Sequence, residues 1–174
     1  MYPAQLFSTP VHAQANIPVT TPRKPAESRF VVVSGKPVRI AIPDYAIDLA
    51  IDEGNYNPAD NSWTLSDTNA QFATFTALAN NHTGNTFIYG HATDIVFGKL
   101  AAAMPPVGTI ARVYTDNNNV FLYHFSDAKT LTPSDTSVFD GAMSGKPRLT
   151  IQTCTGIFSE WRTMYQFDFI KVEK

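Results

Sequence analysis

Apolar and polar residues alternate with the two-residue period of β-strands in several segments of the chain. Seven segments carry this pattern or are short apolar runs bounded by turn residues: 37–42, 47–51, 86–89, 108–114, 120–125, 148–154 and 162–172. Turn sequences separate them, such as 116–119, where asparagine tolerates a left-handed backbone. Strands that follow one another at hairpin distances predict an antiparallel barrel or sandwich.

Helical spacing is confined to short stretches. Phe72, Phe75 and Ala79 predict a helix over 70–79, with Ser66 or Asp67 as its cap. A second short helix is predicted over 94–103, before Pro105-Pro106, and a helical turn over 135–139. The stretch 54–62 reads as a loop, followed by a short strand over 63–65.

The first 29 residues have a different character. Prolines at positions 3, 10, 18, 22 and 25 prevent a continuous helix there. Residues 11–15 are similar to the small-residue end of a signal peptide, without its hydrophobic core. We therefore expect 1–29 to be a flexible tail or linker, with the remnant of an export or anchor segment as one interpretation, and 30–174 to be the folded domain, starting at 30–33 or 37–42.

Composition narrows the class of protein. A length of 174 residues suits one domain, and 44% hydrophobic with 16% charged residues indicates a globular chain. A net charge of −2 gives no indication of a nucleic-acid partner. No apolar run of about 18 residues predicts a membrane span. The single cysteine cannot form an internal disulfide.

That cysteine lies where a nucleophile could work. Cys154 ends the strand 148–154, and Gly156 follows it, so the thiol should lie at a strand tip. His91 ends an earlier apolar run, and Arg162 begins the last strand. A thiol, an imidazole and a guanidinium at strand ends suffice for thiol acyl transfer. Taken alone, however, a lone cysteine is more often a small buried hydrophobe.

The combination of motifs resembles the signature of the sortases, the cysteine transpeptidases of bacterial cell surfaces. The residues concerned are Thr-Ile-Gln-Thr-Cys at 150–154, Tyr-Gly-His at 89–91 and the downstream Arg162. Ile151 stands where the family usually has leucine. The resemblance covers about 37–172 and implies a mainly β fold: an eight-stranded, mostly antiparallel barrel with a few short helices.

The resemblance also implies roles for these residues. Cys154 would attack as a thiolate, His91 would act as acid and base, and Arg162 would stabilise the oxyanion and clamp the substrate. Thr153 would contact the substrate backbone, and Ile95, Phe97 and Ile157 are candidates for the substrate groove. Next to His91, Asp94 is better interpreted as a helix cap than as a carboxylate that orients the imidazole. His12, His82 and His124 rank behind His91 as candidate bases.

Within the family, the donor is a sorting signal such as Leu-Pro-x-Thr-Gly. It is cleaved after threonine, and the acyl group passes from a thioester to an amine of peptidoglycan or of a pilin. We therefore expect the extracellular face of a bacterial membrane, with anchoring through a segment that this chain lacks. Some sortases bind calcium, but Asp48, Asp52, Glu53 and Asp60 form no ligand-spaced loop, so we expect no required metal or cofactor.

Two alternatives remain open. One is a thiol hydrolase, in which water accepts the acyl group; the other is a non-catalytic β-barrel used for binding, in which Cys154 is buried and inert. The L,D-transpeptidases do not fit, because their Ser-His-Gly-Cys type of motif differs from Thr-Cys-Thr at 153–155. The sequence leaves the exact sorting motif, the acceptor amine and the sortase class undetermined.

Overall fold

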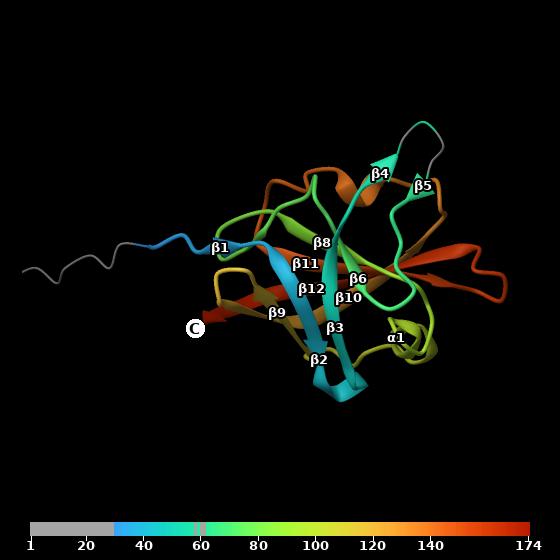
Figure 1. Ribbon diagram of the computed structural model, residues 1–174, viewed down its shortest axis with the longest axis horizontal. Coiled ribbons are helices and arrows are strands. Elements are labelled where there is room, and N and C mark those ends of the chain that lie inside the picture. The colour runs from blue at the N-terminus through green and yellow to red at the C-terminus, as the bar shows by residue number, and fades with distance from the viewer. Residues whose placement is uncertain (1–29, 58, 60–61) are drawn as a thin grey trace, which may run out of the picture. The chain divides into compact units, whose positions relative to one another are not determined.

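The computed structural model describes residues 30–57, 59 and 62–174, drawn in colour in Figure 1. The predicted tail over 1–29 lies outside the described residues. Val31 to Lys174 form one compact unit. Within the described residues, no helix combines the length and the apolar character needed to cross a membrane.

Eight strands of this unit close into a barrel. They are β2 (Pro37–Ile42), β3 (Ile47–Gly54), β6 (Ala70–Ala73), β8 (Asn85–Tyr89), β9 (Ile110–Thr115), β10 (Val120–Leu131), β11 (Arg148–Thr155) and β12 (Trp161–Glu173). Their order around the barrel is β10-β12-β11-β8-β6-β3-β2-β9. The pairs β3–β6 and β8–β11 are parallel, and the other neighbours are antiparallel. This confirms the predicted eight-stranded, mostly antiparallel barrel.

Each half of the chain supplies one continuous side of the barrel. The order β8-β6-β3-β2 contains only strands that precede α1 (Gly98–Ala102), and β9-β10-β12-β11 contains only strands that follow it. The halves meet where β8 pairs with β11 and where β2 pairs with β9. We call the first of these junctions the β8–β11 seam; both strands cross the middle of Figure 1.

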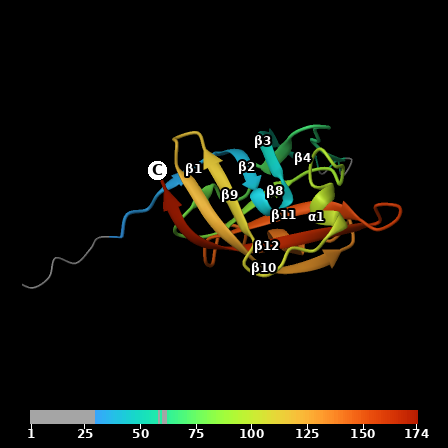
Figure 2. The same ribbon diagram turned by 90° about the horizontal axis from the view of Figure 1, so that it is seen from below.

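Shorter elements flank the barrel. β1 (Ser34–Gly35) pairs with β7 (Ala79–Asn80), and β4 (Tyr56–Asn57) pairs with β5 (Ser62–Trp63). Two 3₁₀ turns, η1 (Pro43–Tyr45) and η2 (Ser137–Phe139), are also present in the described residues. The turn between β11 and β12 extends beyond the barrel in both ribbon views (Figures 1 and 2).

The alternation in the sequence matches the burial of side chains. Ile47, Leu49 and Ile51 of β3 are buried, whereas Asp48 and Ala50 between them are exposed. β8 is buried on both faces: Ile88 packs in the main core, and Phe87 and Tyr89 pack in a second cluster with Ala73, Val138 and Met164. Since successive residues of a strand point to opposite faces, this second cluster covers the outside of the barrel wall at the β8–β11 seam.

The predicted helix over 70–79 is wrong. Ala70–Ala73 is β6, buried at every position, and pairs with β3 and β8. Ser66 Oγ accepts hydrogen bonds from the backbone N–H groups of Thr68 and Asn69, which makes a local turn instead of a helix cap. Pairing on both sides of β6 outweighs a weak helical spacing, because propensity yields to tertiary context.

Three other local predictions need correction. The stretch 54–62 contains most of the β4–β5 hairpin, and 30–33 is not a strand. The helix predicted over 94–103 contains only Gly98–Ala102 and has Phe97, not Asp94, at its N-cap. Its predicted first turn is replaced by tight turns, in which Thr93 O accepts from the N–H groups of Val96 and Gly98, while Val96 and Phe97 are buried.

Candidate active site

The parallel pairing of β8 with β11 sets the position of two predicted site residues. Ile88 lies opposite Ile151, and Tyr89 lies opposite Gln152. The contact continues past β8, because Gly90 N donates to Gln152 O at 3.2 Å and Thr153 Oγ1 donates to Gly90 O at 2.9 Å. Parallel strands end at the same edge of a sheet. His91, after β8, and Cys154, near the end of β11, therefore share one rim of the barrel.

Cys154 and Arg162 face one another across the hairpin of β11 and β12. They are directly opposite in the antiparallel register, and Gln152 is opposite Met164. Directly opposite side chains in such a pair have Cβ atoms about 4.5–5.5 Å apart, on the same face. Cys154 is a free thiol, and both it and Arg162 are half-buried. The structure thus places a guanidinium beside the only thiol of the chain.

The β11–β12 turn holds the guanidinium in place. Arg162 Nη1 donates to Ser159 O at 2.9 Å and to Trp161 O at 3.0 Å. Glu160 Oε2 accepts from Phe158 N at 2.9 Å, and Gly156 has φ +91°. This positive φ favours glycine at position 156, whereas the Glu160 carboxylate that a Cβ would meet there is the movable end of a flexible side chain. Nε and Nη2 of Arg162 have no hydrogen bond to any described residue.

His91 is half-buried at the same rim. Its carbonyl oxygen accepts from Phe97 N at 3.0 Å. The carboxylate beside its ring is Asp67, with Oδ1 4.0 Å from Nε2, and not Asp94. Asp67 is fully exposed, so it would contribute little to the energy of a protonated ring.

The other histidines lie elsewhere. His124 is in β10, opposite Ile110 and Asp168, and His82 follows β7. Neither is at the end of a strand that borders the β8–β11 seam. His12 lies outside the described residues. Among the described histidines, His91 is therefore the one that the fold brings to the rim with Cys154.

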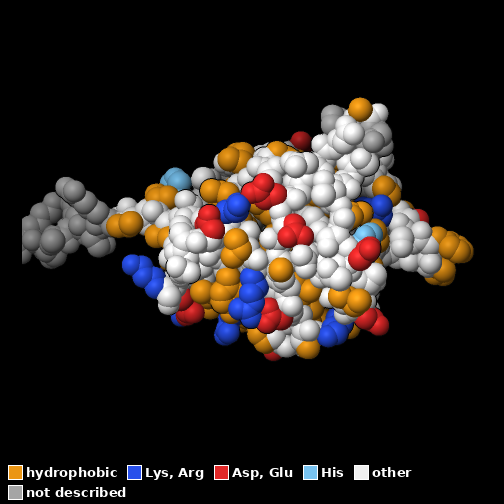
Figure 3. All heavy atoms as spheres, viewed as in Figure 1, with side chains coloured by type: hydrophobic (Ala, Val, Ile, Leu, Met, Phe, Trp, Pro, Cys, Tyr) orange, Lys and Arg blue, Asp and Glu red, His pale blue; other side chains and the backbone are white. Residues whose placement is uncertain are grey.

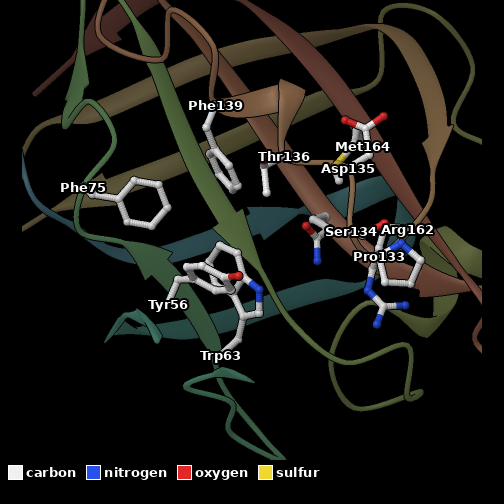
Figure 4. Close-up of a pocket in the computed structure, with 11 residues that line it drawn as sticks. Tyr56, Trp63, Phe75, Pro133, Ser134, Asp135, Thr136, Phe139, Arg162 and Met164 are labelled. Carbon is white, nitrogen blue, oxygen red and sulfur yellow. The ribbon is translucent and has the colours of Figure 1, made fainter. Parts of the chain in front are cut away.

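A cavity of about 520 Å³ adjoins the Cys154–Arg162 pair. It is lined by Tyr56, Trp63, Phe75, Pro133, Ser134, Asp135, Thr136, Phe139, Gln152, Arg162 and Met164. Figure 4 shows Tyr56, Trp63 and Phe75 on one side, and Pro133, Ser134 and Arg162 on the other. Gln152 and Cys154 are two residues apart on β11 and therefore point to the same face. The cavity therefore borders the face of β11 that carries the thiol, and the cavity volume is typical of ligand pockets.

The predicted substrate-groove residues divide into two groups. Ile95 and Ile157 are 65% and 91% exposed, and Figure 3 shows hydrophobic atoms at the tip of the β11–β12 turn, at the right edge. Phe97, a candidate for the groove, and Thr153, expected to contact the substrate backbone, are both fully buried. Phe97 packs in the main core, and the Thr153 hydroxyl is used to hold Gly90.

Sequence reasoning missed the aromatic lining of the cavity. Tyr56 and Trp63 belong to a hairpin, whereas the sequence predicts a loop and a separate short strand there, and Phe75 lies in the predicted helix over 70–79. The available signal was the occurrence of large aromatic residues in otherwise polar loop sequence. No group of three or more His, Cys, Asp or Glu side chains that could hold a metal occurs in the described part of the chain.

The bond from Thr153 to Gly90 gives a testable prediction. Thr153→Val should lower kcat/KM about tenfold, because a buried carbonyl left without its partner costs about 1–3 kcal/mol and the segment just before His91 loses one of its bonds to β11. Kinetics with a cleavable peptide, together with thermal unfolding, would measure this.

Thr150→Val is the matched control. Thr150 is also fully buried on β11, and its hydroxyl donates to Asn85 Oδ1 at 2.9 Å, at the opposite end of the strand. We expect a similar loss of stability with little change in kcat/KM. Equal losses of activity in both variants would show that Thr153 acts only through stability.

The sequence and the structure were compared with known protein families, curated proteins and solved structures. The family model described as the Sortase domain matches residues 40–166. No curated protein matches the sequence. Among solved structures, sortase C-3 from Streptococcus pneumoniae is similar with a TM-score of 0.62 at 18% identity, covering 82% of this chain and 66% of that one.

Two further structures are similar to the same degree. Sortase E1 from Streptomyces coelicolor, solved with a tripeptide in its active site, has a TM-score of 0.61 at 19% identity and covers 80% of this chain and 90% of that one. Sortase A from Listeria monocytogenes has a TM-score of 0.61 at 24% identity and covers 79% and 90%. The chain thus spans just under two thirds of the Streptococcus protein and most of the other two. At these identities the likeness concerns the fold.

Proposed function

Because the chain belongs to the sortase family, we propose that it is a cysteine transpeptidase that cleaves an LPxTG-like sorting signal and transfers the acyl group to an amine. The observation that carries this proposal is the rim at the β8–β11 seam. There the free thiol of Cys154 lies directly opposite Arg162, and His91 follows the strand paired with β11. A half-buried thiol at a rim is hard to reconcile with an inert core cysteine.

The chemistry assigns one task to each group. The Cys154 thiolate attacks the carbonyl carbon of the donor threonine, forming a C–S bond and an oxyanion. Collapse of this intermediate breaks the C–N bond, and the His91 imidazolium gives its proton to the departing amine. The acceptor amine then attacks the thioester, His91 takes up its proton, and the Cys154 thiolate leaves.

Arg162 is suited to stabilise the oxyanion of both steps. Its guanidinium is permanently charged and planar, and bonds to Ser159 O and Trp161 O fix one end of it. The Nε and Nη2 groups remain to donate to a substrate oxygen beside Cys154. A donor held in place before the reaction needs no reorganisation when charge develops.

The acceptor, the place of action and the need for a cofactor are inferred from the family alone. We propose peptidoglycan or a pilin as the source of the acceptor amine, and the bacterial cell surface as the place of action. We also propose that the reaction needs no metal or other cofactor. Each of these proposals can be tested with the purified protein or in cells that express it.

The decisive experiment is mass spectrometry of Leu-Pro-x-Thr-Gly-like peptides incubated with the protein and hydroxylamine. A hydroxamate of the threonine-ended fragment, absent with Cys154→Ala, would support a thioester. A free carboxylate without any hydroxamate or amine adduct would favour the thiol hydrolase. No product from any peptide would count against both enzymes and favour the binding barrel.

Arg162→Lys tests the oxyanion role. We expect kcat to fall about 10²–10³-fold, which is typical for loss of an oxyanion donor, because lysine keeps the charge but cannot reproduce the planar fork. Steady-state hydroxamate formation measures it. Arg39→Lys is the control, since Arg39 pairs with Asp48 on β3 and lies outside the site. An Arg162→Lys variant as active as the control would remove Arg162 from the mechanism.

A further inference from the structure

The cavity beside Arg162 has one wall made of aromatic rings. They are Tyr56 and Trp63 of the β4–β5 hairpin, Phe75 of the β6–β7 connection and Phe139 of η2. Ring centroids are 5.0 Å apart for Tyr56–Trp63, 5.7 Å for Trp63–Phe139 and 5.0 Å for Phe75–Phe139. We call these four residues the aromatic wall.

The barrel supports the aromatic wall from behind. The Trp63 ring lies 4.7 Å from that of Tyr89 and 6.4 Å from that of Phe87, both buried on β8. Phe75, in contrast, is 47% exposed. A large ring that is fixed by its neighbours yet half open to a cavity presents apolar surface that a ligand can cover.

The cavity lies at a defined distance from the thiol. Gln152 lines the cavity, and Cys154 is two residues further along β11, a separation of about 7 Å at 3.3 Å per residue. In an LPxTG-like donor, the leucine precedes the cleaved threonine by three residues, which span about 10 Å when extended. A donor whose threonine carbonyl lies at Cys154 can therefore place the side chain of its leucine position in the cavity.

We propose that this site selects a donor with an aromatic side chain at the leucine position, so that the signal begins with Phe, Tyr or Trp. This inference rests on the proposed function and specifies its substrate. An aliphatic side chain gains from burial alone, whereas a ring gains a further edge-to-face or offset contact with the aromatic wall. A cavity of about 520 Å³ also has room for a side chain larger than leucine.

A cationic side chain is the competing ligand, because aromatic rings also attract cations. The cavity contains one carboxylate, Asp135, and hydrogen bonds from Ser137 lower its pKa, so it is charged at neutral pH. However, Asp135 Oδ1 already accepts from Ser137 N at 2.9 Å, and the Arg162 guanidinium lines the same cavity and repels a cation. These charges favour a neutral ring.

The test compares peptides X-Pro-Ala-Thr-Gly in which X is Leu, Phe, Trp or Lys. We expect kcat/KM for hydroxamate formation to be about tenfold or more higher with Phe or Trp than with Leu. Phe75→Leu should reduce this ratio towards one. Tyr114→Leu, on β9 and outside the cavity, is the matched control and should leave the ratio unchanged. A Leu or Lys peptide that equals or exceeds the Phe peptide would overturn the inference.

A binding measurement separates failure of this inference from failure of the proposed function. The dissociation constants of the same peptides are measured with the Cys154→Ala variant by calorimetry. If no peptide yields product but the Phe peptide binds about tenfold more tightly than the Leu peptide, the aromatic preference is supported and the proposed transfer reaction is contradicted. If none binds, or Leu binds as tightly as Phe, the aromatic preference is wrong.

Discussion

Replacing Cys154 with alanine is expected to abolish peptide cleavage, by on the order of 10⁴-fold or more, without unfolding the protein. The chain has no other thiol that could take over the attack. The side chain is half-buried at the end of β11, and the buried apolar residues of that strand, Leu149 and Ile151, are unchanged. Hydroxamate formation and thermal unfolding would measure the two effects.

The same variant identifies the covalent intermediate. Wild-type protein quenched in acid during turnover should gain the mass of the threonine-ended fragment, and Cys154→Ala should not. Thr150→Val is a useful comparison, because Thr150 is on the same strand, lies outside the cavity lining, and its replacement keeps the thiol. Cleavage that persists in Cys154→Ala would mean that another group is the nucleophile.

His91→Ala should lower kcat about 10²–10⁴-fold, the usual contribution of a positioned acid–base group. The loss should be greatest in the steps that move a proton to or from the amine, so the pH–rate profile should change shape as well as height. Added imidazole should restore part of the activity if the ring acts chemically.

His124→Ala provides the comparison for His91. His124 lies in the middle of β10, opposite Asp168, and it is not at the rim that carries Cys154. We expect near wild-type rates from it. A reversal of the two results, with His124 essential and His91 dispensable, would move the acid–base role and contradict the geometry described above.

Much of the barrel could be predicted, because the alternation of apolar and polar residues in the sequence matches the burial of side chains in the strands. Strands β2, β3, β11 and β12 match predicted segments closely, since one face of each enters the core. The helix over 70–79 failed for a physical reason. Alanine and phenylalanine suit either a helix or a buried strand, and the choice is made by β3 and β8, which flank β6 and are distant in sequence.

Some residues of the candidate site could likewise be predicted from the sequence, and others could not. Cys154, His91 and Arg162 could be singled out because each stands at a predicted strand end in a known motif. The burial of Thr153 and Phe97 depends on how β8 and α1 pack, which local sequence does not determine. The aromatic wall joins residues from separate segments, and nothing in any one segment indicates the others.

The β8–β11 seam has a consequence for a protein cut in two. The strands before and after α1 form separate sides of the barrel, with His91 on one and Cys154 and Arg162 on the other. Val107, in the connection to β9, is 76% exposed and offers a place for the cut. Neither fragment would hold both Cys154 and His91, so only the reassembled barrel would turn over substrate. Such a pair would be a self-reporting complementation assay, in which enzyme activity follows fragment association.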